Sequence, residues 1–160
     1  MMGQEKEDKI MKKSAQECLS LAKEFLNQEK AWAPHVQFNE NERYFHLLHE
    51  DEDTEVWLLC WTGANDTGWH DHGASQAGVV VASGDIMEDI PTLSGAVARK
   101  MKKGDEITME NGHIHRMYAQ NTQGVSIHVY SPPLSRVSQY YSDDTGRLYR
   151  IEQDGSKPLG

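Results

Sequence analysis

The chain has 160 residues, of which 38% are hydrophobic and 26% charged, an ordinary composition for a folded domain. This length suits one compact domain, and we take residues 1–160 as a single domain. The formal net charge of −9 argues against a nucleic-acid partner, because phosphate binding needs clustered Lys and Arg. The sequence predicts no membrane span, since it has no apolar run of about 18 residues.

The N-terminal residues lack the apolar segment of a secretory signal, and the chain has two cysteines, Cys18 and Cys60. Cys18 falls in a helical pattern and Cys60 in a strand-like run, so we expect no disulfide framework. We therefore expect the reducing cytoplasm as the compartment.

A helix is predicted over residues 5–28, where no Gly or Pro interrupts the sequence. Its apolar residues recur at helical spacing and are Ile10, Cys18, Leu21, Phe25 and Leu26. Pro34 breaks the pattern.

From residue 42 the sequence changes to short runs rich in Val, Ile, Tyr and Trp, separated by Gly, Asn, Asp and Pro. The candidate strands are 43–50, 55–62, 68–73, 77–84, 85–90, 95–102, 105–111, 113–120 and 125–133. Such spacing predicts an all-β fold with an N-terminal helix, in which residues 42–133 form a small barrel or jelly roll. Residues 134–160 form a polar C-terminal extension with a frayed end.

Two histidines separated by one residue, His70 and His72, point to the same side of a strand and can share one metal ion. A partly exposed strand face is the simpler alternative. The spacing resembles the first motif of cupins, which are small jelly-roll barrels with a metal in the mouth. Gly84 takes the glycine position of that motif, but the acidic ligand position falls on Gln76 or Ala77.

The second cupin motif selects a third histidine. Gly104, Gly112 and His115 are in register with it, and Glu110 stands where proline is usual. This register favours His115 over His113 as the third ligand, and His113 stays as the alternative.

A set of three neutral imidazoles leaves the full charge on a divalent metal ion. Such a centre favours anionic ligands and would deprotonate a bound thiol. Imidazole ligands suit iron, copper, zinc and nickel, so the ligand types do not choose among these metals.

Three further polar residues, Ser126, His128 and Tyr130, alternate along a predicted strand and share one face. They can form one hydrogen-bonded line beside the metal, with His128 holding the Tyr130 phenol in place. The alternative is a buried polar ladder that satisfies only itself.

Together, "LLCW", "HDH", "HIHR" and "HVYSPP" resemble the thiol dioxygenases, specifically the cysteine dioxygenase family, over about residues 43–133. The resemblance implies a cupin fold, Fe(2+) on His70, His72 and His115, and conversion of a small thiol and O2 into a sulfinic acid. It also implies a catalytic relay, formed by Ser126, His128 and Tyr130. Trp61 matches a family tryptophan beside the substrate.

The chain departs from the family at two positions. Ala77 stands where mammalian enzymes carry a cysteine crosslinked to the relay tyrosine, so that thioether cannot form. His46 replaces an arginine that grips the substrate carboxylate, or the glutamine of 3-mercaptopropionate dioxygenases, while Tyr44 is retained. We expect His46 and Tyr44 to orient the far end of the substrate, unless Arg116 or Arg43 supplies the missing cation.

The sequence thus predicts a monomeric, cytoplasmic thiol dioxygenase. One alternative is another metal-dependent cupin enzyme, such as a lyase, an isomerase or a carbon dioxygenase. The other is a non-catalytic cupin that binds a small ligand.

Overall fold

The computed structural model describes residues 12–135 and 137–151. Helix α2, Ala15–Leu26, begins at a capping box: Ser14 Oγ accepts from Glu17 N at 3.1 Å, and Ser14 N donates to Glu17 Oε1 at 3.0 Å. The predicted start at residue 5 is wrong for residues 12–14, which precede α2, and residues 5–11 lie outside the described residues. After α2 come α3, Glu29–Trp32, and the 3-10 helix η1, Ala33–His35.

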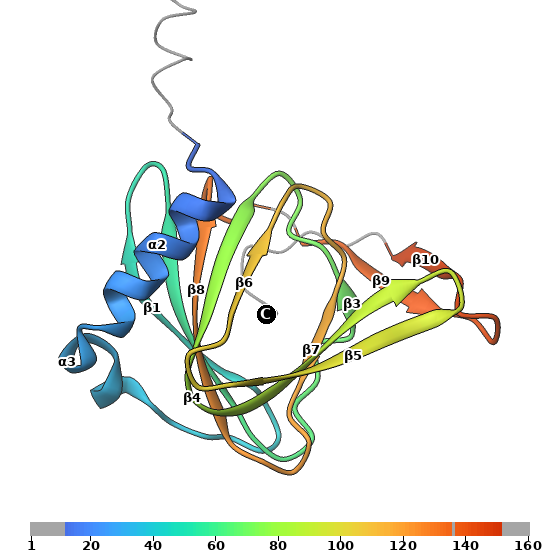
Figure 1. The fold of residues 1–160 in the computed structure, drawn as a ribbon, viewed down its shortest axis with the longest axis horizontal. Coiled ribbons are helices and arrows are strands. Elements are labelled where there is room, and N and C mark those ends of the chain that lie inside the picture. The colour runs from blue at the N-terminus through green and yellow to red at the C-terminus, as the bar shows by residue number, and fades with distance from the viewer. Residues whose placement is uncertain (1–11, 136, 152–160) are drawn as a thin grey trace, which may run out of the picture.

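Antiparallel strands make up the rest of the fold (Figure 1). They are β1 (Tyr44–Glu50), β2 (Glu55–Trp61), β3 (Trp69–His70), β4 (Gln76–Thr92), β5 (Gly95–Lys102), β6 (Glu106–Met109), β7 (Arg116–Tyr118), β8 (Gly124–Ser131), β9 (Gln139–Ser142) and β10 (Leu148–Ile151). Within the described ranges, one sheet has the order β1-β2-β8-β4-β5, with β6 and β7 also paired to β4, and a second has the order β10-β9-β3.

Strand β4 is continuous, although the sequence predicted two separate strands, 77–84 and 85–90. Its first half pairs with β8 and β6 and its second half with β5 and β7. The register shifts between Val81 and Ser83, and Gly84 follows with a φ of +67°. A Cβ at Gly84 would lie 1.8 Å from Gln123 O, so only glycine fits here. Gly84 therefore bends β4. We call the part of the sheet in which β4 pairs with β6 and β8 one wall, and the part in which it pairs with β5 and β7 the other wall.

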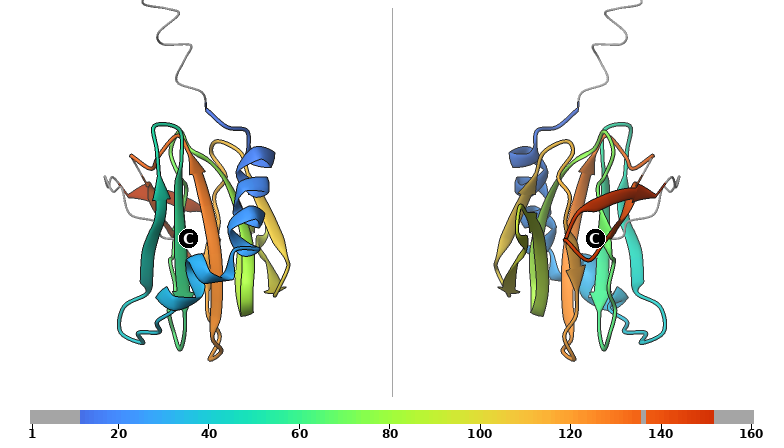
Figure 2. Two further views of the ribbon diagram at one scale, coloured as in Figure 1. Left: turned by 90° about the vertical axis from the view of Figure 1, so that its left-hand side faces the viewer. Right: turned by 90° about the vertical axis from the view of Figure 1, so that its right-hand side faces the viewer.

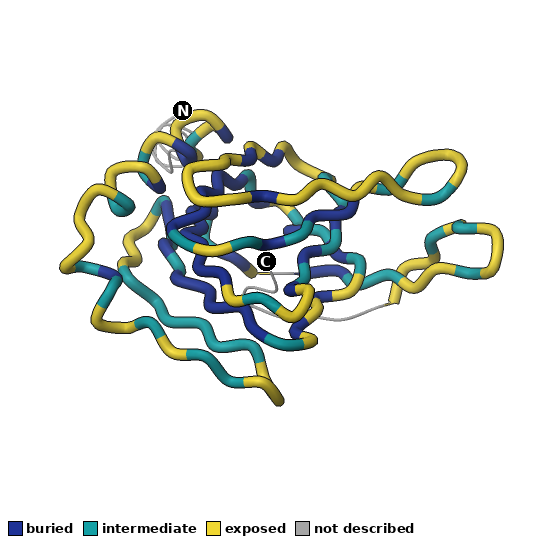
Figure 3. Tube along the Cα trace, turned by 60° about the horizontal axis from the view of Figure 1, so that its bottom comes forward, coloured by how far each residue is buried: buried dark blue, intermediate teal, exposed yellow. Residues whose placement is uncertain are grey.

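The two faces of the large sheet bury different clusters. Helix α2 covers the outer face (Figure 2), where Cys18 and Ala22 pack with Leu58, Val80 and other strand residues. The inner face contributes a second cluster between the walls, including Leu59, Val79, Met117 and Tyr130. Figure 3 shows buried strands at the centre and exposed hairpins projecting to one side.

The C-terminal extension contains two strands, β9 and β10, that the sequence did not predict, and its predicted frayed end lies outside the described residues. Strand β9 pairs with β3, so that Tyr140 lies opposite Trp69 and Gln139 opposite His70. The β9–β10 hairpin lies beside the β4–β5 hairpin (Figure 1), where a Cβ on Gly146 would be 3.4 Å from Gly95 Cα. Within the described ranges, no helix has the length and apolar character to cross a membrane.

Candidate metal centre

Three histidines from two separate parts of the chain meet on the inner side of the sheet. His70 N donates to His115 O and His115 N donates to His70 O, each at 3.0 Å, so the two residues form a reciprocal backbone pair. His72 follows two residues after His70. All three are buried, and one ring nitrogen of each lies within 4.8 Å of the others. The structure thus brings together the three predicted metal ligands.

Hydrogen bonds donated by Nδ1 orient two of these rings. His70 Nδ1 lies 3.0 Å from Gly68 O, and His115 Nδ1 lies 2.8 Å from Glu88 Oε2. Because each partner is an acceptor, Nδ1 carries the proton in both rings and Nε2 presents its lone pair. This is how metal-binding imidazoles are usually held, so the residues fit a divalent metal ion.

Sequence reasoning missed Glu88, which is fully buried on β4. Burial raises the pKa of its carboxyl, but the rings of His113 and His115 outweigh burial and lower that pKa to about 2. His113 Nε2 lies 3.7 Å from Glu88 Oε2, so His113 groups with Glu88 and His115. The structure therefore brings His115, and not His113, to His70 and His72.

The loop between the first two ligands is tied to the C-terminal strands. Asp71 N donates to Ser138 O at 2.9 Å, and Tyr140 Oη donates to Asp71 Oδ2 at 2.6 Å. Asp71 Oδ1 accepts from Gly73 N. Asp71 therefore holds the His-Asp-His turn.

The predicted relay forms on the inner face of β8. Ser126 Oγ lies 2.6 Å from His128 Nε2, and Tyr130 Oη lies 3.2 Å from His128 Nδ1. Trp61 Nε1 donates to Ser126 Oγ at 2.9 Å, so the tryptophan extends the line to four fully buried side chains. The Tyr130 ring lies 5.3 Å from the His72 ring, centroid to centroid, which places the phenol beside the triad.

Burial controls protonation in this line. It lowers the pKa of His128 well below its ordinary value. Electrostatic repulsion from His115, Arg43 and His70 lowers this pKa further. Burial also raises the pKa of Tyr130, although Arg43 acts in the opposite direction. His128 is therefore a neutral imidazole and Tyr130 a neutral phenol.

The residue opposite Tyr130 in the sheet is Ala77. Directly opposite residues of antiparallel strands have side chains on the same face. A cysteine at this position would face the phenol, whereas the methyl group of Ala77 offers no sulfur for a crosslink.

Three residues that were predicted to bind substrate face away from the triad. Tyr44 and His46 lie opposite Cys60 and Leu58, both in the outer cluster. The His46 ring stacks on His35, 4.0 Å between centroids. Strand alternation places their neighbour Phe45 on the inner face, so the placement does not support the expected role of Tyr44 and His46.

Arg116 also points outward, because His115 and Met117 on either side of it are fully buried. Its guanidinium forms a bidentate pair with Asp66, with Nη2 to Oδ2 at 2.7 Å and Nε to Oδ1 at 3.0 Å. This pairing commits Arg116 to a surface ion pair.

Arg43 instead lies on the inner face. Its guanidinium carbon is 5.3 Å from the centroid of the Trp61 ring, and its charge acts on both His128 and Tyr130. Its Nε is buried without a hydrogen-bond partner among the described residues. Burial lowers the Arg43 pKa, which nonetheless leaves an arginine charged.

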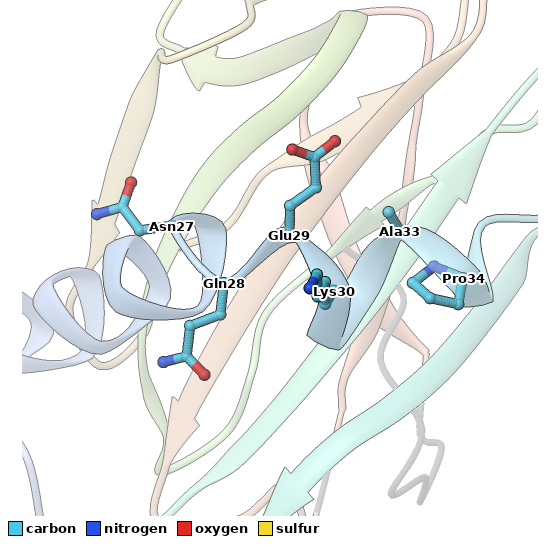
Figure 4. Close-up of a pocket in the computed structure, with 6 residues that line it drawn as sticks. All are labelled: Asn27, Gln28, Glu29, Lys30, Ala33 and Pro34. Carbon is cyan, nitrogen blue, oxygen red and sulfur yellow. The ribbon is translucent and has the colours of Figure 1, made fainter.

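A hollow of about 780 Å³ lies over the α2–α3 junction, lined by Asn27, Gln28, Glu29, Lys30, Ala33 and Pro34 (Figure 4). Its residues are exposed apart from the half-buried Ala33. It holds no histidine and no buried charge, so we place the functional site at the triad.

The sequence model of the family described as cysteine dioxygenase type I matches residues 8–143. The chain belongs to the type I cysteine dioxygenase family. This family is metal-dependent, and the histidine triad is a site that could hold its metal.

Solved structures similar to this chain share its fold. A double-stranded β-helix protein from Klebsiella pneumoniae is 16% identical with a TM-score of 0.55, covering 76% of this chain and 94% of its own. An RmlC-like cupin from Desulfovibrio desulfuricans is 17% identical with a TM-score of 0.53, covering 61% and 89%. KdgF from Halomonas sp. is 16% identical with a TM-score of 0.52, covering 60% and 84%. The predicted cupin fold is confirmed.

Proposed function

We propose that the protein is an iron-dependent thiol dioxygenase that acts on a small thiol bearing a carboxylate. The reaction is R–SH + O2 → R–SO2H, in which both oxygen atoms bond to sulfur. Sulfur loses four electrons and dioxygen gains them, and the thiol proton is retained in the sulfinic acid. The observation that carries the proposal is the buried histidine triad beside the Tyr130 relay, in a chain of the cysteine dioxygenase family.

Fe(2+) held by His70, His72 and His115 supplies redox chemistry and open coordination positions, which zinc could not match because it has no redox chemistry. The other residues then have defined tasks. Glu88 orients His115 through its 2.8 Å hydrogen bond. Tyr130, fully buried beside His72, holds its hydroxyl where substrate would lie and excludes water.

Arg43 supplies the cation for the substrate carboxylate in this proposal. It is on the triad side of β1, where position 46 is not, and its Nε has no protein acceptor among the described residues. The ring of Trp61, 5.3 Å from the guanidinium carbon, contacts this cation and helps to hold it. A charged hydrogen bond of about 1.5–3 kcal/mol corresponds to a difference of about 10- to 150-fold in affinity.

Oxygen uptake tests the proposal directly. The full chain is reconstituted anaerobically with Fe(2+), then exposed to oxygen with cysteine, 3-mercaptopropionate, mercaptosuccinate or cysteamine. We expect stoichiometric uptake and a sulfinic acid product with at least one of the mercapto acids. A lack of uptake with all four thiols would refute the assignment and leave the other cupin activities to be tested.

The role of Arg43 has its own test. Arg43→Met should raise KM for a mercapto acid by about 10- to 150-fold and leave KM for cysteamine, which has no carboxylate, unchanged. His46→Ala serves as the control because His46 lies on the outer face, stacked on His35. A larger rise in KM for His46→Ala than for Arg43→Met would contradict the assignment of Arg43.

A further inference from the structure

The relay ends in a group that can only donate a hydrogen bond. Trp61 Nε1 lies 2.9 Å from Ser126 Oγ, and both residues are fully buried. An indole N–H has no acceptor capacity, so the serine oxygen must be the acceptor in this contact. The direction of the first hydrogen bond, from Trp61 to Ser126, is therefore fixed.

This first step sets the direction of the remaining hydrogen bonds. With Ser126 Oγ accepting from Trp61, the serine proton is donated to His128 Nε2, 2.6 Å away. His128 then carries its own proton on Nδ1 and donates it to Tyr130 Oη at 3.2 Å. In this direction Trp61 only donates, and Ser126 and His128 each accept one hydrogen bond and donate one. Tyr130 accepts from His128 and leaves its own proton available for an acceptor beside the histidine triad.

If the hydrogen bonds ran in the opposite direction, the Ser126 proton would point at the Trp61 N–H, which is a donor. If Tyr130 donated to His128 Nδ1, His128 Nε2–H would donate to Ser126 Oγ. The serine proton would then need another acceptor, but the one further partner of Ser126 Oγ among the described contacts is the Trp61 N–H, a donor. A buried hydroxyl proton facing a donor is unfavourable.

The neighbouring charges support a neutral ring in the middle of this line. The Arg43 guanidinium over Trp61 acts on His128, and burial keeps His128 from taking a second proton. A neutral imidazole has one donor nitrogen and one acceptor nitrogen, as a one-way line of hydrogen bonds requires.

We propose that Trp61 is a positioning residue that fixes His128 in the Nδ1–H tautomer and so directs the Tyr130 hydroxyl proton toward the histidine triad. Its use in catalysis rests on the proposed function: the phenol would donate to the anionic sulfur or to oxygen at the metal. The tautomer itself depends only on the contacts of the four side chains.

Nitrogen NMR of the full chain tests this inference without any measurement of activity. The protein is labelled with 15N-histidine and loaded with zinc(II), which suits imidazole ligands and is diamagnetic. His128→Gln identifies the His128 resonances by their loss. Protonated and unprotonated ring nitrogens have well-separated 15N shifts, and we expect Nδ1 to be protonated and Nε2 unprotonated. A wild-type ring protonated on Nε2 would overturn the inference.

Trp61→Phe removes the N–H and keeps a ring at the position. The serine proton can then turn toward the vacated space, so we expect both tautomers, with the two His128 shifts moving toward each other. Trp32→Phe is the matched control, because Trp32 Nε1 also donates one hydrogen bond, to Leu26 O at 3.1 Å, and the residue lies in the outer cluster, away from His128. His128 shifts that stay unchanged in Trp61→Phe would overturn the role of Trp61. The wild-type tautomer remains decisive even if the variant fails to fold, and failure of the oxygen-uptake assay would not change it.

Discussion

Removal of the Glu88 carboxylate should weaken metal binding at the histidine triad. The side chain is 1% exposed and its Oε2 lies 2.8 Å from His115 Nδ1. Its loss in Glu88→Ala leaves the third ligand without the group that fixes its orientation and tautomer. A hydrogen bond to a charged group contributes about 1.5–3 kcal/mol, which corresponds to about 10- to 150-fold in Kd. This agrees with the roughly 10- to 100-fold effect of such outer ligands in other metal sites.

Glu88→Gln separates geometry from charge. The amide oxygen can still accept from His115 Nδ1–H, but a hydrogen bond between neutral groups is about half as strong. We therefore expect a loss of roughly 3- to 10-fold, between the wild type and Glu88→Ala. Asp89→Asn is the control, because Asp89 is on the opposite face of β4, accepts from Tyr118 Oη at 3.0 Å, and is also buried.

The assay is an anaerobic titration of metal-free protein with Fe(2+) against a competing chelator, with thermal unfolding to confirm that each variant is folded. An unchanged Kd in a folded Glu88→Ala protein would refute the reasoning. An equal loss of Fe(2+) affinity in Asp89→Asn would also refute it, because removal of a negative charge anywhere near the triad would then weaken metal binding.

The same carboxylate makes the stability of the metal-free protein depend on pH. The folded-state pKa of Glu88 is about 2, below its ordinary value of 4.5. The unfolded chain therefore binds more protons between pH 4.5 and pH 2, so the stabilisation is present above pH 4.5 and is lost as the pH falls through that range. The shift corresponds to about 3 kcal/mol, which Glu88→Gln should lack in urea unfolding at neutral pH. Parallel pH profiles for the two proteins would contradict this.

Gly78→Ala should destabilise the fold by about 1–3 kcal/mol or more, because the new Cβ would lie 2.1 Å from Leu19 N and force α2 away from β4. Urea unfolding measures this, and an unchanged midpoint would contradict the direct packing of α2 on the strand. Burial raises the pKa of Cys18 to about 11, so iodoacetamide at pH 8 should react far more slowly with it in the folded than in the urea-unfolded chain. Equal rates would argue against the burial. Tyr140→Phe removes the 2.6 Å hydrogen bond to Asp71 and should weaken Fe(2+) binding, since Asp71 holds the turn between two ligands. A wild-type Kd would show that this contact serves the fold alone.

Much of the site follows from strand alternation, which the sequence carries directly. His70 and His72, two residues apart, and Ser126, His128 and Tyr130, at alternate positions, each had to share one face of a strand. The glycine spacing around His115 also predicted which histidine of the "HIH" run joins them. Local geometry is enough for the two strand inferences because neighbours along a strand fix each other's direction, whereas the choice of His115 rested on the resemblance to the second cupin motif.

Only the tertiary structure decided which face of β1 meets the triad. Alternation divides the strand into two sets, one with Arg43 and Phe45 and the other with Tyr44 and His46. Both faces of this sheet are covered, one by the inner core and the other by the α2 layer, so both sets contain apolar or aromatic residues. Without a polar face, the hydrophobic pattern cannot choose between them.

The remaining parts of the site depend on long-range packing. Glu88 and His115 are 27 residues apart and meet because β4 bends at Gly84 and carries its second half into the other wall. Likewise, Ser138 and the β9 residue Tyr140 hold the His-Asp-His turn, in a polar extension for which the sequence predicted no strand. The sequence by itself placed His70 beside His72, and Ser126 beside His128 and Tyr130, through the fixed period of a strand. The tertiary structure decided what orients them and which cation faces them, because bends and pairings between distant strands have no local signal.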